Sequence, residues 1–116
     1  MTMNKVKYHQ GDIVWLNFSP SIGNEMKGIH PAVIVSSNAY NQVSNYIVVC
    51  PITSHGNDFR GYVPLEGYSI HGRINTTQVY SYSLKRLTSI KVVDHLKIED
   101  MLMVQQYINF IFTVDD

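Results

Sequence analysis

A small β-barrel followed by a single helix is the fold that this sequence of 116 residues predicts. The first observation is a series of short apolar, β-branched runs, and the second is the Gly, Pro, Asn and Asp residues that separate them at regular spacing. The third is that helical periodicity occurs only near the C-terminus. Hydrophobic residues make up 45% of the chain, so one domain of this length can bury a core.

Several segments have the alternation and the β-branched content of strands. In residues 13–18, alternation places Ile13 and Trp15 on one face and the intervening side chains on the other. Residues 31–36 are almost wholly apolar, so this strand is expected to be buried on both faces. Pro51 is expected to bend the end of the next strand away from the sheet. The strands expected after the second are 46–53, 59–66, 73–82 and 89–93.

Only the C-terminal end has the periodicity of a helix. Apolar residues recur at positions 98, 101, 102, 104, 108 and 111, and Asp94 is the expected N-cap or entry residue. This apolar face is wider than one side of a small barrel covers, so the helix is expected both to pack on the barrel and to help form a homodimer. Residues 38–45 are expected to form a polar turn. No repeat or linker divides the chain, so residues 1–116 are expected to form a single domain.

The charge balance and the cysteine content narrow the class of protein. The chain has nine Lys and Arg against nine Asp and Glu, which disfavours a uniformly basic surface but leaves a local basic groove open. The single cysteine, Cys50, lies in an apolar run and is expected to be a core residue of a cytoplasmic protein. No apolar stretch approaches the roughly 18 residues that cross a membrane. Residues 1–10 also lack the apolar region expected of a secretion signal.

The loop between the first two strands contains an acid, a base and an imidazole, namely Glu25, Lys27 and His30. Pro31 biases the preceding residue toward extended backbone, so the His30 ring is expected to have a defined direction at the start of the second strand. A loop of this kind between rigid strands is a suitable place for acid–base chemistry. Taken alone, the same residues also fit a long hairpin loop with a solvated histidine and an incidental acid.

A set of motifs occurs here in the order and at the spacing of one known family. They are GDIVWLNFSP at 11–20, G-x-E-x-x-G at 23–28, PAVIVS at 31–36 and PITS at 51–54. Together with Gly61 to Leu65, Gly72, Gln78 and the C-terminal helix, they resemble the MazF/PemK family of toxin endoribonucleases over about residues 8–112. The resemblance implies a mainly β (α+β) fold: an SH3-like β-barrel with a C-terminal α-helix and an ordered core of about 8–112.

The resemblance also implies a function. Members of the family are toxins of type II toxin-antitoxin modules, and they are cytoplasmic homodimers that cleave single-stranded mRNA at short sequences. Cleavage uses no metal or other cofactor and leaves a 2′,3′-cyclic phosphate and a 5′-hydroxyl. A partner of the MazE/PemI antitoxin type is implied, with a C-terminal segment that covers the RNA groove. The residues agree with a metal-free route, because the histidines at 9, 30, 55, 71 and 95 are scattered and form no metal-ligand motif.

Carried onto this sequence, the resemblance assigns catalytic roles to His30, Thr53 and Glu25. The Thr53 hydroxyl is expected to donate to the scissile phosphate, and Glu25 to orient His30 or contact a base edge. The residues assigned to RNA binding are Asn17, Lys27, Ser54, His55 and Gln78. Without the resemblance, these positions would be interpreted as strand ends or solvated surface residues.

One position departs from the family pattern. Family members usually have an arginine immediately before the Pro-Ala/Val-Val run, where this chain has His30. Arginine binds a phosphate with two prongs and keeps its charge, whereas histidine titrates near neutrality. His30 is therefore either a working acid or base, with His55 as the complementary group, or an attenuating substitution. In the second case the chain is a weak or inactive member that binds RNA or antitoxin.

Two other classes of protein remain open. One is a small barrel that binds a peptide or nucleic acid without catalysis, and the other is a toxin that traps a protein target such as DNA gyrase. The gyrase-directed family places its function on C-terminal residues. The acidic tail at 112–116 lacks that family's terminal Trp-Gly-Ile pattern, which disfavours the second class.

Overall fold

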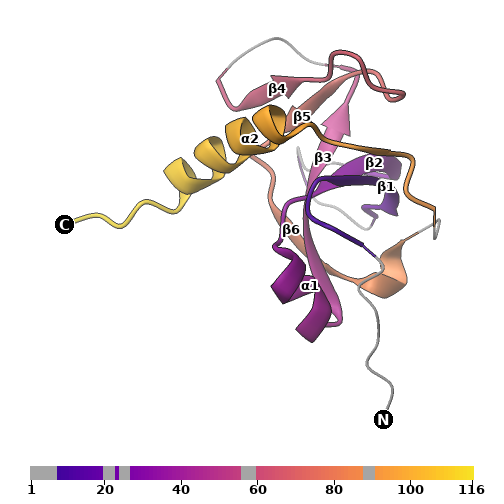
Figure 1. The fold of residues 1–116 in the computed structure, drawn as a ribbon, viewed down its shortest axis with the longest axis horizontal. Coiled ribbons are helices and arrows are strands. Elements are labelled where there is room, and N and C mark those ends of the chain that lie inside the picture. Colours follow the sequence, from indigo (N-terminus) through magenta and orange to yellow (C-terminus); the bar gives the residue numbers. More distant parts are fainter. Residues whose placement is uncertain (1–7, 20–22, 24–26, 56–59, 88–90) are drawn as a thin grey trace.

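The computed structural model describes residues 8–19, 23, 27–55, 60–87 and 91–116. Their strands are β1 (Asp12–Asn17), β2 (Ile29–Ile34), β3 (Tyr46–Thr53), β4 (Tyr62–Pro64), β5 (Arg73–Asn75), β6 (Tyr80–Ser83) and β7 (Asp94–His95). Their helices are α1 (Asn38–Val43), the short 3-10 helix η1 (Leu84–Arg86) and α2 (Ile98–Ile111). The strands form one curled antiparallel sheet in the order β4-β5-β3-β2-β1-β7, and β6 pairs with the first half of β3. The long helix α2 runs beside β4 and β5 (Figure 1), so the predicted mainly β fold with a C-terminal helix is confirmed.

The alternation of β1 divides the core between two faces of the sheet, as its sequence predicts. Ile13 belongs to a first core cluster, which includes the buried Met101 and Val104 of α2. Val14 and Leu16 point to the opposite face. This second core cluster comprises Tyr8, Val14, Leu16, Phe18, Ala32, Ile34, Ile47 and Val49. Strand β2 supplies side chains to both clusters, so its predicted burial on two faces is also confirmed.

Helix α2 has the predicted bounds and buries one side. Met101, Val104 and Ile108 are buried against the barrel. Leu102 and Phe110 are 58% and 74% exposed, so part of the predicted apolar face points to solvent. Within the part of the chain that the structure describes, no helix is long and apolar enough to span a membrane.

Strand β3 includes Pro51, and its pairing with β2 ends at this residue, so the last two residues of the strand pair only with β5. Pro51 is paired with Ala32 of β2, and pairing on the opposite edge of β3 changes from β6 to β5 across this residue. A proline is tolerated here because it is the last residue paired with β2 and is unpaired on the other edge of β3, between the β6 and β5 pairings. The preceding Cys50 is fully buried, and burial raises the pKa of its thiol to about 12, so it is a core residue as predicted.

Three loop assignments from the sequence are corrected by the structure. Residues 38–45, predicted as a turn, contain α1, which Ser37 caps by accepting a hydrogen bond from the Tyr40 N–H at 3.1 Å. The single strand predicted over 73–82 is divided into β5 and β6. Asn75 Oδ1 accepts from the Thr77 N–H at 3.0 Å and turns the chain between them.

The third correction concerns the connection into α2. Of the strand predicted at 89–93, residues 91–93 are not in a strand and 88–90 lie outside the described residues. Asp94 lies in β7 rather than at the helix N-cap, which is Lys97. The strand predicted over 59–66 is likewise shorter, since only Tyr62–Pro64 pairs and Phe59 lies outside the described residues.

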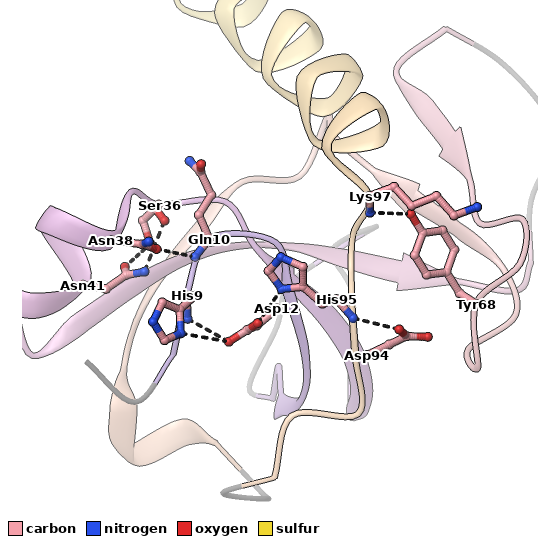
Figure 2. Close-up of polar contacts among 10 residues, drawn as sticks. All are labelled: His9, Gln10, Asp12, Ser36, Asn38, Asn41, Tyr68, Asp94, His95 and Lys97. Atoms are coloured by element: carbon pink, nitrogen blue, oxygen red, sulfur yellow. Dashed lines mark hydrogen bonds and ion pairs between the residues drawn. The ribbon is translucent and has the colours of Figure 1, made fainter. Parts of the chain in front are cut away.

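A buried carboxylate ties β1 to β7. Asp12 is 5% exposed, and its Oδ1 lies 2.7 Å from His95 Nδ1 (Figure 2). Its Oδ2 accepts a hydrogen bond from the His9 backbone N–H at 2.7 Å. These contacts fix the direction in which the chain enters α2 from the edge of the sheet.

Candidate functional site

The candidate site is a row of side chains across β2, β3 and β5. The printed pairing of β2 with β3 ends at Ala32 and Pro51, so His30 lies two residues before the end of that pairing and Thr53 two residues after it. On the other edge of β3, Thr53 is paired directly with Arg73. Side chains directly opposite each other in antiparallel strands share a face, with Cβ atoms roughly 5 Å apart. Thr53 and Arg73 are therefore a cross-strand pair, and with His30 at the same end of the neighbouring strand they are called the row below; all three are half-buried.

Alternation places this row on the face of the second core cluster. Ala32, two residues after His30, belongs to that cluster, so His30 shares its face. Ile52 precedes Thr53 and Ile74 follows Arg73. Both isoleucines belong to the first core cluster, on the opposite face. The row therefore lies at the rim of the second core cluster, where polar side chains meet a rigid apolar base.

The Thr53 hydroxyl is held by a local turn. It accepts a hydrogen bond from the His55 N–H at 3.1 Å and donates to the His55 carbonyl oxygen at 3.3 Å. The His55 ring itself is exposed. The long donated bond is one that the hydroxyl can exchange for a better acceptor, such as a phosphate oxygen.

A cleft of about 370 Å³ is lined by His30 and by Ile52 of the first core cluster, so it opens on the face opposite Thr53 and Arg73. It brings His30 and the predicted Ser54 together with Trp15 and His71, which are two residues that the sequence did not single out. Its other lining residues are Pro31, Ile52, Ser69 and Ile70. An aromatic wall with a few polar groups suits a flat, partly apolar ligand such as a base.

Gly72 brings the 67–72 segment against the end of β3. Its φ of 133° is a conformation that L side chains rarely adopt, and a Cβ on it would lie 2.5 Å from the Thr53 carbonyl oxygen. Only glycine fits this close approach. The contact holds His71 and Arg73 beside Thr53.

The same segment is anchored to the beginning of α2. The Tyr68 hydroxyl donates to Asp100 Oδ2 at 2.6 Å. It accepts from the Lys97 backbone N–H at 2.8 Å (Figure 2). Burial, reinforced by the Asp100 carboxylate, raises the pKa of Tyr68 to about 12, so the phenol keeps its proton. Ser69 donates its backbone N–H and its hydroxyl to Asp94 Oδ2 at 2.7 and 2.9 Å. The 67–72 segment, which supplies Ser69, Ile70 and His71 to the cleft, is therefore held by hydrogen bonds that lie outside the cleft.

Asp94 is expected to make this anchoring dependent on pH. Hydrogen bonds from the backbone N–H groups of Ser69 and His95 lower the pKa of Asp94 below its ordinary value of 3.8. A lowered pKa in the folded state adds stability above the unfolded value, and this stability is lost as the pH falls below about 4. We expect Asp94→Asn to lower the free energy of unfolding by about 1–2 kcal/mol at pH 7.

Urea unfolding at pH 7 and at pH 3 measures this effect. The difference between wild type and Asp94→Asn should shrink at the lower pH, whereas Asp115→Asn in the exposed tail should change nothing at either. An equal difference at both pH values would contradict the electrostatic explanation.

The other predicted site residues are placed in different ways. Gln78 Oε1 accepts from the Tyr80 hydroxyl at 2.8 Å, and Tyr80 is paired with Val49 on the second-cluster face. Asn17 is exposed, and its Oδ1 accepts from the Ser19 N–H at 3.0 Å. Lys27 is exposed, and Glu25 lies outside the described residues. The cleft thus groups His30 with Ser54, Thr53 is paired with Arg73, and Asn17 and Lys27 are exposed at the two ends of the β1–β2 loop.

Arg73 and His71 are the residues of this site that sequence reasoning missed. Arg73 was placed only as the start of a strand, and His71 was counted among scattered histidines. The signal that could have found both is Gly72, because a glycine between a histidine and an arginine indicates a close backbone approach. Among the described residues, no group of three or more His, Cys, Asp or Glu side chains is arranged to hold a metal ion.

Comparison with known proteins identifies relatives of the whole chain. A family model described as PemK-like, MazF-like toxin of type II toxin-antitoxin system matches residues 9–112. The endoribonuclease toxin ChpB of Escherichia coli K12 is 39% identical over 83 residues, which cover 66% of this chain and 71% of ChpB. The endoribonuclease toxin MazF of the same strain is 32% identical over 71 residues, which cover 61% of this chain and 64% of MazF.

Solved structures share the fold at lower identity. MazF of Deinococcus radiodurans has a TM-score of 0.83 and 23% identity, covering 96% of this chain and all (100%) of that one. A MazE-MazF structure from the same organism has a TM-score of 0.78 and 24% identity, covering 97% and 100% of the two chains. Because the family model spans nearly the whole sequence, this chain belongs to the family of PemK-like, MazF-like toxins of type II toxin-antitoxin systems.

Proposed function

We propose that this chain is a sequence-specific endoribonuclease that cleaves single-stranded mRNA in the cytoplasm as the toxin of a toxin-antitoxin module. The observation that supports this most is the cross-strand row, because it sets a titratable imidazole, a hydroxyl donor and a cation side by side. The relatives named as endoribonuclease toxins support the same activity.

The reaction is an attack of the ribose 2′-oxygen on the adjacent phosphorus. The O2′–P bond forms and the P–O5′ bond breaks, which leaves a 2′,3′-cyclic phosphate and a 5′-hydroxyl. His30 is the base that accepts the 2′-hydroxyl proton. The Thr53 hydroxyl exchanges its 3.3 Å bond to the His55 carbonyl for a non-bridging phosphate oxygen and so stabilises the developing charge. Glu25, in the adjoining loop, orients the imidazole.

The leaving O5′ needs a proton, and two imidazoles at this edge of the barrel are candidates. His55 lies two residues after Thr53 in the same turn, and His71 lines the cleft with His30. The single variants His55→Gln and His71→Gln show which of the two imidazoles donates this proton. Loss of the acid removes the falling limb of the plot of rate against pH, because that limb reports deprotonation of the donor.

The test of the function is incubation of the purified chain with a long RNA in excess EDTA, followed by mapping of the ends. Discrete fragments with 2′,3′-cyclic phosphate and 5′-hydroxyl ends are expected. A His30→Ala protein purified in parallel controls for contaminating nuclease. Fragments that appear only when Mg²⁺ is restored would contradict the metal-free route. RNA binding with no fragments under either condition would favour the binding module.

We also propose a homodimer built on the exposed side of α2. Leu102 and Phe110 lie two turns apart on this helix and are mostly exposed, whereas Met101 and Ile108 are buried in the first core cluster. Leu102→Asp combined with Phe110→Asp is expected to give a folded monomer, because a charge cannot be buried unpaired in an apolar interface. Sedimentation velocity measures whether the variant is a monomer, and circular dichroism measures whether it is folded.

The same substitutions on the buried side of α2 are the matched control. Met101→Asp combined with Ile108→Asp should unfold the protein rather than dissociate it, since both side chains are within the core. A Leu102→Asp/Phe110→Asp protein that remains a dimer would show that another surface mediates assembly.

An antitoxin of the MazE/PemI type is the proposed protein partner. A segment that covers the RNA-binding row must satisfy His30, Thr53 and Arg73 in place of a phosphate, so it should present carboxylates beside apolar residues. Its affinity is expected to fall as salt increases, because charge pairs at a half-exposed site are screened. Isothermal titration at low and high salt measures this, and equal affinities would contradict the charge mimicry.

A further inference from the structure

We propose that Arg73 binds the scissile phosphate and supplies the permanent positive charge of the active site. The inference rests on the proposed endoribonuclease function and deepens it, because it names the group that balances the charge which gathers on phosphorus during cleavage.

The backbone fixes where Arg73 lies. It is paired with Thr53 on one side and with Pro64 on the other, so its position is set by three adjacent strands rather than by a loop. The next residue, Ile74, is fully buried in the first core cluster. Because neighbouring residues in a strand point to opposite faces, Arg73 is directed to the face of the second cluster, beside Thr53.

The proposed cleavage reaction requires a positively charged group beside the phosphate. Attack on phosphorus adds negative charge to the non-bridging oxygens in the transition state. Thr53 is a neutral donor, and His30 must begin neutral in order to accept a proton. Arg73 is the member of the row that keeps its charge at all working pH values and offers two parallel donors to a phosphate.

Arg86 also lies near this face, and its guanidinium contacts an aromatic ring and the β1–β2 loop. The Arg86 guanidinium lies 4.2 Å from the centroid of the Tyr82 ring. It also donates to the carbonyl oxygens of Asn17 and Ser19 at 3.3 and 3.2 Å. These contacts hold the beginning of the β1–β2 loop, so Arg86 positions the loop, whereas Arg73 is the arginine paired with Thr53.

The experiment compares Arg73→Gln, Arg73→Lys and wild type on a short RNA that contains a cleavage site mapped with the wild type. Arg73→Gln is expected to lower kcat about 100-fold or more, as loss of one transition-state donor does. Arg73→Lys should recover part of this loss, because it keeps the charge without the planar fork. Arg60→Gln is the matched control: Arg60 is exposed outside the row, and its loss should leave kcat unchanged.

A second measurement separates phosphate binding from a structural role. The same RNA with a 2′-deoxyribose at the cleavage position cannot react, so its equilibrium affinity can be measured over a range of salt. The slope of log affinity against log salt should fall by roughly 0.7 in Arg73→Gln, as for one phosphate contact on a single strand, and should not change in Arg60→Gln.

The outcomes are distinct. Wild type that cleaves no RNA overturns the proposed function, and the role of Arg73 with it. Wild type that cleaves while Arg73→Gln retains kcat within threefold, or an unchanged salt slope, overturns only the inference. A large loss of cooperative urea unfolding in Arg73→Gln would assign the residue a structural role and would also overturn it.

Discussion

Replacing His30 with alanine is expected to lower the rate of RNA cleavage by about 100-fold or more, the usual size of a general acid–base contribution. His30 is half-buried near the beginning of β2 and belongs to neither core cluster, so the alanine removes an imidazole without disturbing a core side chain. The rising limb of the plot of rate against pH should disappear with the ring, because that limb reports the base losing its proton. Single-turnover cleavage of a short RNA across the pH range measures both effects.

His30→Arg is the variant that decides between a working imidazole and an attenuating substitution. If the ring is the base, the arginine protein should cleave more slowly than wild type, and its rate should no longer change with pH through neutrality. An arginine protein that cleaves far faster would show that His30 weakens a site designed for a bidentate cation. The inferred role of Arg73 favours the first result, because the row already holds a guanidinium beside Thr53.

Replacing Gly72 with alanine is expected to reduce both stability and cleavage. The new Cβ would meet the Thr53 carbonyl oxygen at 2.5 Å in a backbone conformation, φ 133°, that alanine rarely adopts. We expect a loss of about 1–3 kcal/mol in the free energy of unfolding. Because the clash separates β5 from β3, cleavage should fall by about 100-fold, as it does when reacting groups are misplaced by an ångström.

Gly67→Ala is the matched control for this prediction. Gly67 also has a positive φ, of 80°, but a Cβ there meets only the flexible Lys97 Nζ at 3.3 Å. Gly67→Ala should lower the free energy of unfolding because of its backbone conformation, but it should leave the rate of cleavage unchanged. If the two variants have the same urea midpoint and the same rate, the close approach to Thr53 has no role in the site.

Strands with a strong apolar pattern could be predicted from the sequence, and weakly patterned segments could not. β3 and α2 have the predicted bounds because each has a buried side that its composition defines. The segment 73–82 was predicted as one strand, because Thr and Val favour strands wherever they occur. The turn between β5 and β6 depends instead on the Asn75 side chain accepting from the Thr77 N–H, a contact that propensity does not reveal.

The candidate site could be predicted only in part, for a similar reason. His30 and Thr53 were found through motifs, and their placement at the same end of neighbouring strands depends on the pairing of β2 with β3. Arg73 is separated from Thr53 by twenty residues of sequence, including a turn and β4, so nothing local indicates that the two are paired. Contacts between distant strands are the part of a site that a single sequence does not supply.

The burial of Cys50 protects its thiol from oxidants and from thiol-alkylating reagents. With its thiol pKa raised to about 12, only about one molecule in 100,000 holds the reactive thiolate at pH 7. Peroxide, which attacks thiolates, therefore has no accessible cysteine target among the described residues. A single cysteine introduced on the surface, for instance as Leu102→Cys, can consequently be labelled selectively to report on assembly through α2 in the otherwise unmodified chain.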